Sequence, residues 1–229
     1  MLSIAAFVAV TSLTVPGAQS ADLAALFPPA REGLLIQVDP KDANSATSLT
    51  DVLSQFTRST GITIQTTKET QAVMRNVALG LNRSVDVPPS EVYRIVEVLL
   101  RANDFVVDHL SDREPRIWSV VSLQSGPHSR ASAIWVEEKD LQAWQDHAAT
   151  LVSTTIQLPN TDVRTLSNSM RAMFTDVNTQ QIIPAGASSL LITGFAPDVV
   201  ALARMLHRID AESKLVERPP QSAEQPKAR

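Results

Sequence analysis

The 229-residue sequence contains no cysteine and has few glycines and aromatic residues. Without cysteine, the chain can form no disulfide and can carry no lipid on a cysteine after an export signal. Its seven glycines are too widely spaced for a dinucleotide fingerprint, a phosphate-binding loop or a nucleophile elbow. Aromatic residues make up only 4% of the chain, so the core must consist mainly of valine, isoleucine, leucine and alanine.

The chain also lacks a basic field and a metal-binding pattern. Its formal net charge is -4, which disfavours nucleic acid as a partner. No two histidines stand three or four positions apart, and none lies in an HExxH frame, so no zinc site is predicted. We predict no catalytic residue, cofactor or metal site, and expect structural or surface roles for all four histidines, which are His109, His128, His147 and His207.

The two ends of the chain differ in composition from the rest. Residues 2–13 are mostly apolar, and a Pro16-Gly17 break precedes the small-x-small sequence Ala18-Gln19-Ser20. This pattern predicts a signal peptide over 1–20, too short to span a bilayer, and thus export to the periplasm. The polar, proline-containing segment 214–229 is predicted to be a disordered tail.

Residues 34–124 have the pattern of one small αβ module. Ser48 and Asp51 form a capping-box-like start of a helix, and Gly61 stands where such a helix ends. Pro88-Pro89 begins a second amphipathic helix. Strands are expected over 34–38, 62–65, one or two within 78–87, 105–107 and 116–123.

Residues 153–213 predict a second module with the order β-α-β-β-α. Strand 154–158 precedes a helix capped by Asn160-Thr161-Asp162, and runs 181–184 and 189–193 precede a last helix beginning at 194–197. Between the modules, residues 125–152 are interpreted as a connector. It begins with a hinge around Ser125-Gly126-Pro127 and contains a short strand and a helix starting at Glu137, with Leu141, Trp144, Ala148 and Leu151 on one side.

Both modules resemble domains of secretins, the ring-forming outer-membrane channels of type II secretion and type IV pilus systems. Residues 49–64 match the pattern L-x-x-V/A-L-x-x-h-x-x-x-T/S-G-h-x-h of the short N-terminal domain that secretins share with signalling TonB-dependent receptors, and residues 99–105 match its second helix. Residues 154–210, with the sequence SLLITG, resemble the KH-like secretin repeat. A KH domain would bind RNA through a Gly-x-x-Gly loop, which is absent here.

The resemblance implies an α+β, non-enzymatic periplasmic protein that interacts with other proteins in or beside an envelope secretion or pilus assembly. It implies secretion-system or envelope partners, a possible homo-oligomeric ring, no pore domain and no integral membrane segment after signal cleavage. Two alternatives stay open. One is a periplasmic sensor module of TonB-receptor type, and the other is a small secreted enzyme of an unrecognised family.

Four residues are candidates for partner binding. The favoured interpretation of Trp135 and Trp144 is that they fix the connector to its neighbours. Tryptophan is also enriched at interface hot spots, so one of them could be an exposed anchor. Ile156 and Leu158 lie in a strand whose edge could accept a further strand, as could Leu190–Ile192. These strand residues are also candidate core positions.

Overall fold

The computed structural model describes residues 22–38, 47–75, 77, 79–125, 131–171 and 179–215. The predicted signal peptide (1–20), the centre of the predicted hinge with His128, and nearly all of the predicted tail (214–229) lie outside the described residues. Helices and mixed sheets make up the described part, which confirms the predicted α+β class. None of its helices is long and apolar enough to cross a membrane.

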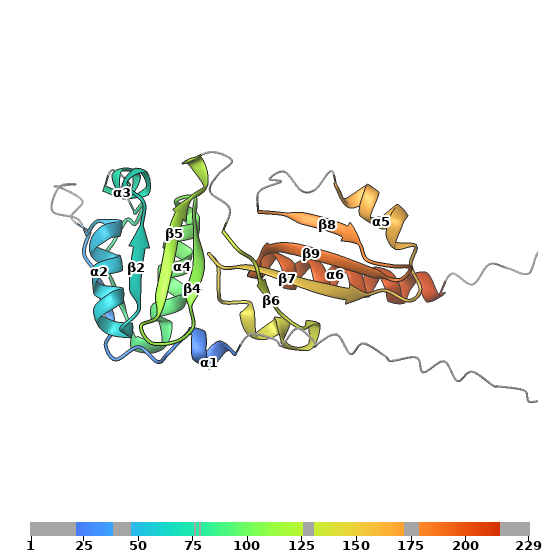
Figure 1. Cartoon of the computed structure of the whole chain (residues 1–229), viewed down its shortest axis with the longest axis horizontal. Coiled ribbons are helices and arrows are strands. Elements are labelled where there is room, and N and C mark those ends of the chain that lie inside the picture. The colour runs from blue at the N-terminus through green and yellow to red at the C-terminus, as the bar shows by residue number, and fades with distance from the viewer. Residues whose placement is uncertain are drawn as a thin grey trace, which may run out of the picture.

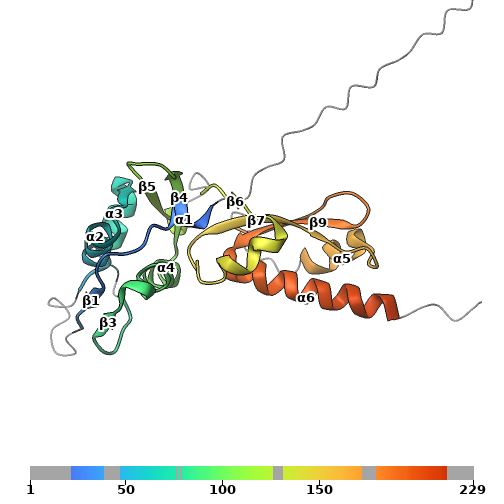
Figure 2. The same ribbon diagram turned by 90° about the horizontal axis from the view of Figure 1, so that it is seen from below.

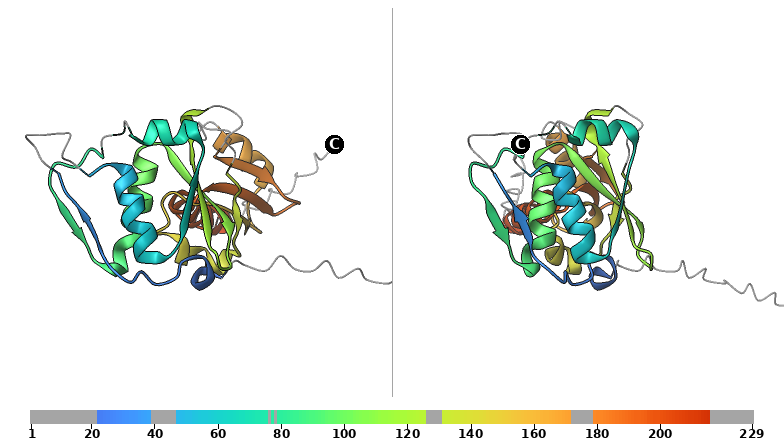
Figure 3. Two further views of the ribbon diagram at one scale, coloured as in Figure 1. Left: turned by 60° about the vertical axis from the view of Figure 1, so that its left-hand side comes forward. Right: turned by 90° about the vertical axis from the view of Figure 1, so that its left-hand side faces the viewer.

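The first half of the chain packs two helices on one face of a three-stranded sheet (Figures 1 and 3). The sheet has the order β2-β5-β4, in which β2 runs parallel and β4 antiparallel to β5. A separate two-stranded ribbon pairs β1 with β3. The elements are α1 (Leu23–Leu26), β1 (Leu34–Ile36), α2 (Leu49–Thr60), β2 (Thr63–Thr66), α3 (Lys68–Arg75), β3 (Val85–Val87), η1 (Pro89–Glu91), α4 (Val92–Ala102), β4 (Phe105–Ser111) and β5 (Ile117–Ser122).

Local sequence signals account for the bounds of α2. The Ser48 hydroxyl accepts a hydrogen bond from the Asp51 N–H, and the Asp51 carboxylate accepts one from the Ser48 N–H at 3.0 Å. The Ser48 hydroxyl also donates to the Asp51 carboxylate, and this bond, together with the bond from the Ser48 N–H, holds the pKa of Asp51 below its usual value. Gly61 ends the helix with φ at 77°, a conformation that glycine adopts without strain. The expected capping box and glycine stop are therefore present.

The segment between β2 and α4 differs from the sequence prediction. One strand, Val85–Val87, lies within the range 78–87 where one or two were expected, but the helix α3 before it was not predicted. The helix is mostly polar, and only Thr70 and Met74 are buried. Two buried positions give too sparse an apolar stripe for the helical period to stand out in the sequence.

The second half of the chain forms a four-stranded sheet with the order β6-β7-β9-β8 (Figures 1 and 2). Helices α5 and α6 cover one face of this sheet. The order of elements, β7, α5, β8, β9 and α6, is the β-α-β-β-α order expected for this segment. The elements are η2 (Leu123–Ser125), β6 (Ile134–Trp135), η3 (Glu138–Trp144), β7 (Leu151–Gln157), α5 (Val163–Met170), β8 (Gln181–Pro184), β9 (Ser189–Phe195) and α6 (Ala196–Leu215).

The connector helix was predicted incorrectly. The structure has a 3-10 helix over Glu138–Trp144 in place of an α-helix continuing to Leu151, which instead begins β7. The apolar spacing from Leu141 to Leu151 fits a helical period, but Thr150 and Leu151 form backbone contacts that belong to sheets. Tertiary pairing thus overrides the local pattern here.

Candidate functional site

The structure places most of the predicted partner-binding side chains in the core. Trp144, Ile156 and Leu158 each have 0% of their surface exposed, so Trp144 is not an exposed anchor in this structure, and Ile156 and Leu158 are the core positions they were also expected to be. Trp144 fixes the connector to the second core, which was the alternative interpretation of that residue. Trp135 is partly buried and pairs with Ser153 across β6 and β7.

The predicted sites of strand addition have different environments. Strand β9 lies between β7 and β8, so Leu190–Ile192 is not at an edge. On its other side, β7 pairs with β6 through Val152 and Ser153. Addition of a partner strand along the rest of β7 stays a prediction.

Strand β2 is an edge strand that was not among the predicted sites of strand addition. The Thr63 N–H donates to the Arg116 carbonyl at 2.9 Å, and Thr63 pairs with Ile117. In a parallel ladder, alternate residues direct their N–H and C=O groups to the neighbouring strand. Ile64 and Thr66 therefore direct theirs to the free side of β2, where no described residue forms a backbone hydrogen bond with them.

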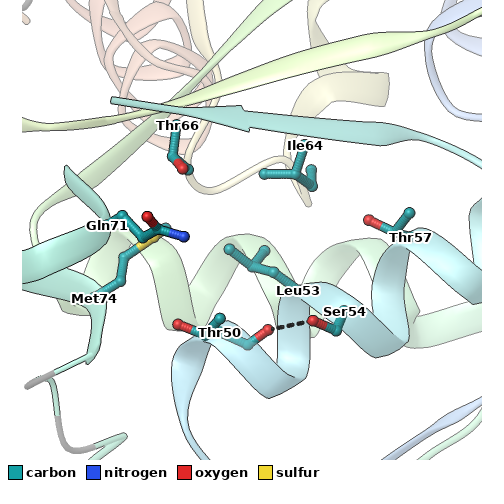
Figure 4. Close-up of a pocket in the computed structure, with 8 residues that line it drawn as sticks. All are labelled: Thr50, Leu53, Ser54, Thr57, Ile64, Thr66, Gln71 and Met74. Atoms are coloured by element: carbon teal, nitrogen blue, oxygen red, sulfur yellow. Dashed lines mark hydrogen bonds between the residues drawn. The ribbon is translucent and has the colours of Figure 1, made fainter. Parts of the chain in front are cut away.

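A groove lies beside this edge, between β2, α2 and α3 (Figure 4). Its volume is about 200 Å³, and every side chain that lines it is uncharged. Figure 4 shows Ile64 and Thr66 pointing from β2 toward α2, with Gln71 and Met74 closing one end. The lining residues are Thr50, Leu53, Ser54, Thr57, Ile64, Thr66, Gln71 and Met74.

A second notable cluster of polar groups joins the two halves of the molecule. Glu97 of α4 is 0% exposed. Its Oε1 lies 2.8 Å from His147 Nδ1, and its Oε2 accepts hydrogen bonds of 3.0 Å from the Ala149 N–H and from the Thr150 hydroxyl. These three partners stand directly before β7, so one buried carboxylate of the first half holds the segment that leads into the second sheet.

The same segment is fixed on its other sides. The Val107 N–H of β4 donates to the Ala149 carbonyl at 2.9 Å, and the Ala196 N–H at the start of α6 donates to the Thr150 carbonyl at 3.0 Å. At the surface, Arg101 of α4 forms an ion pair with Asp198 of α6. The two halves are therefore joined by backbone and side-chain bonds as well as by the chain itself.

Aromatic rings fill the space around this junction. Phe27, which follows α1, packs against both hydrophobic cores and stacks on the His147 ring with a centroid distance of 3.7 Å. It also meets Trp118 and Trp144 edge to face. Figure 2 shows α1 between the two halves, in agreement with these contacts.

His109 extends the polar cluster without a charge. Its Nε2 lies 3.3 Å from the Thr150 hydroxyl, which donates its own hydrogen to Glu97 and so must accept from His109. The ring hydrogen is therefore on Nε2, and Nδ1 is buried without a partner among the described residues. Burial, followed by the nearby His147, lowers the pKa of His109 to about 3.

This cluster has the residue types of an acid–base site but not its accessibility. Glu97 is enclosed, and its oxygens already contact three groups of the protein. No group of three or more His, Asp or Glu side chains in the described ranges could hold a metal ion. Through these contacts Glu97 connects the first half of the structure to the segment that leads into β7.

Comparison with known proteins gives similarity at the level of structure. No family model matches the sequence, and no curated protein matches it. The structural neighbours include N-terminal domains of type II secretion secretins. One is the Klebsiella pneumoniae type II secretion outer-membrane complex of PulD, PulS and the PulC HR domain, with a TM-score of 0.47, 15% identity and coverage of 72% of this chain and 26% of that chain.

Two further neighbours have lower scores. The enterotoxigenic Escherichia coli GspC–GspD complex has a TM-score of 0.26 and 14% identity, and the match covers 78% of this chain and 99% of that chain. The N-terminal domain of the secretin XcpQ from Pseudomonas aeruginosa has a TM-score of 0.25 and 14% identity, with 78% and 64% covered. The chain thus spans about a quarter of the Klebsiella chain and under two thirds of the Pseudomonas chain. At 14–15% identity, no functional role is transferred from these proteins to an individual residue of this chain.

Proposed function

We propose that this protein is a periplasmic, non-enzymatic interaction protein that acts as a scaffold in or beside an envelope secretion assembly. It is built from two small modules, with limits at 34–124 and 153–213 and a connector over 125–152. Its partners are other secretion-system or envelope proteins, and copies of the chain could form a ring. Small interfaces become strong in such an assembly because many of them form at once.

The observation that carries this proposal is the joint centred on Glu97. Its carboxylate binds His147, Ala149 and Thr150 across the two halves, and Phe27 packs against both cores. A joint of this kind presents the outer surfaces of both units in one fixed relation, as a scaffold requires. Both oxygens of the enclosed Glu97 carboxylate contact groups of the protein itself, which supports a structural role for this residue.

Crosslinking in living cells tests the proposal. The natural sequence has no cysteine, so a single substitution such as Gln65→Cys, on the exposed outer face of β2, gives one defined attachment point for a crosslinker. We expect products whose masses correspond to homotypic rings or to a complex with a secretion-system protein. A protein that stays monomeric and uncrosslinked at several such surface positions would contradict the proposal.

A further inference from the structure

We infer that β2 accepts an extended, uncharged segment of a partner protein as an additional strand, and that alternate side chains of this segment lie in the groove between β2 and α2. This inference rests on the proposed function and names the surface and the kind of partner segment involved.

The free edge supplies the backbone half of the interaction. Ile64 and Thr66 direct two N–H and two C=O groups away from β5, and no described residue bonds to these groups. Unpaired strand edges are templates for strand addition, which gives affinity through main-chain hydrogen bonds. Neither residue is a proline, and β2 contains no charged side chain that would oppose pairing.

The groove supplies the side-chain half. Side chains alternate between the two faces of a strand, so every second residue of an added strand would lie on the α2 side of the sheet. That is the side toward which Ile64 and Thr66 point in Figure 4. The added side chains would therefore contact α2 residues such as Leu53 and Thr57 within the groove.

The chemistry of the lining selects the partner segment. All the lining side chains are apolar or carry a neutral hydroxyl or amide, so none could neutralise a charge placed among them. A charged side chain in the groove would lose hydration without gaining an ion pair. Valine, threonine or serine would instead fit the apolar and the neutral polar parts of the lining. The Thr50 hydroxyl, in the wall of the groove, is buried and has no hydrogen-bond partner among the described residues.

Binding of defined peptides to the full-length protein tests the inference. The probe is a blocked peptide with neutral alternate residues, acetyl-SVTVSVT-amide, and the controls are acetyl-SETESET-amide and acetyl-SKTKSKT-amide. We expect the neutral peptide to shift the amide NMR signals of Ile64 and Thr66 and to slow their hydrogen exchange about tenfold. The charged peptides should bind at least about tenfold more weakly.

A pair of substitutions on one strand provides the matched control. Thr66→Lys places a charge in the groove, and Gln65→Lys places the same charge on the exposed opposite face of β2. We expect Thr66→Lys to abolish peptide binding and Gln65→Lys to change it by no more than about twofold. Because Thr66→Lys could disturb folding, Thr57→Lys on α2 repeats the test from the other wall of the groove.

Three results would overturn the inference. One is the absence of shifts at Ile64 and Thr66 at about 1 mM neutral peptide, a weak-binding limit. The second is equal binding of neutral and charged peptides, and the third is dimerisation through β2, which would make a second copy the occupant. If these tests fail while crosslinking still finds an envelope partner, strand addition is wrong and the proposed function stands. If crosslinking finds no partner, the proposed function fails whatever the peptides do.

Discussion

Replacing Glu97 with alanine tests the joint between the two halves directly. The substitution removes an acceptor of three contacts and leaves the Ala149 N–H and the Thr150 hydroxyl buried without it. Hydrogen bonds to a charged group contribute about 1.5–3 kcal/mol each, but burying the carboxylate costs several kcal/mol, so the sum of the bonds overstates the effect. Leaving the buried Ala149 N–H and Thr150 hydroxyl without their acceptor costs about 1–3 kcal/mol each, so we expect a loss of about 2–6 kcal/mol for Glu97→Ala.

Two further variants separate the joint from general effects of losing a charge. Glu97→Gln keeps one side-chain oxygen as an acceptor, so it should cost less than Glu97→Ala. Glu91→Ala removes a carboxylate just before α4 that pairs with Arg94 at the surface. Exposed pairs of this kind contribute about 0–1 kcal/mol, which sets the expected loss for this control.

Urea unfolding followed by circular dichroism and tryptophan fluorescence measures these differences. Trp118 belongs to the first core and Trp144 to the second, so fluorescence reports on both. We expect Glu97→Ala to lower the unfolding midpoint and to separate the unfolding of the two halves, because their shared contacts are lost. A loss below about 1 kcal/mol, or a loss equal to that of Glu91→Ala, would refute the structural role assigned to Glu97.

Three other predictions follow from contacts of the described residues. Because the pKa of His109 is lowered in the fold, this side chain takes up a proton near pH 6.5 in the unfolded chain but stays neutral down to about pH 3 in the folded one. Its contribution to stability is therefore complete above pH 6.5 and is lost as the pH drops. Between pH 7 and pH 5 this residue should account for a loss of up to about 2 kcal/mol that is absent in His109→Gln, and equal pH profiles for both proteins would contradict its neutral state. A Cβ on Gly33 would lie 2.2 Å from the Val87 carbonyl oxygen, so Gly33→Ala should cost about 1–3 kcal/mol in urea unfolding, and a neutral effect would show that the ribbon can shift. Arg101→Ala removes the ion pair to Asp198 and a cation–π contact, in which the guanidinium carbon lies 4.5 Å from the centroid of the Phe195 ring. A double-mutant cycle with Asp198→Ala should give a coupling energy of about 1 kcal/mol, which should become smaller in high salt.

Much of the secondary structure could be predicted because its signals are local. The Ser48–Asp51 capping box and the Gly61 stop define α2 through contacts over a few residues. The amphipathic stripe of α4 and the strand runs of the second half are similarly readable. Helix α3 was not predicted, and the connector helix was predicted incorrectly. In α3 the buried residues are too few to form a recognisable apolar stripe. In the connector, Thr150 and Leu151 pair with other strands although the apolar spacing of this segment fits a helix.

The candidate sites were much less predictable. Trp144 was a candidate anchor because of its residue type, and its burial excludes that role. Ile156 and Leu158 were candidates through the edge of their strand; their side chains are buried, and strand addition there stays a prediction. The β2 groove combines α2, α3 and β2, so no single sequence pattern describes it. Glu97 was also missed, although a glutamate beside the buried residues Val96 and Leu99 was a visible irregularity in the α4 pattern.

The α+β class, the helix caps and the apolar faces could be predicted from sequence patterns, because each depends on residues within about one or two turns or one strand of each other. Which strand edges stay free and how the two halves are joined depends on contacts between distant parts of the chain. Glu97 and His147 are separated by 50 positions in the chain, and Glu97 and Thr150 by 53. Hydrogen bonds act only over about 3 Å, so the chain must fold before such residues can become partners.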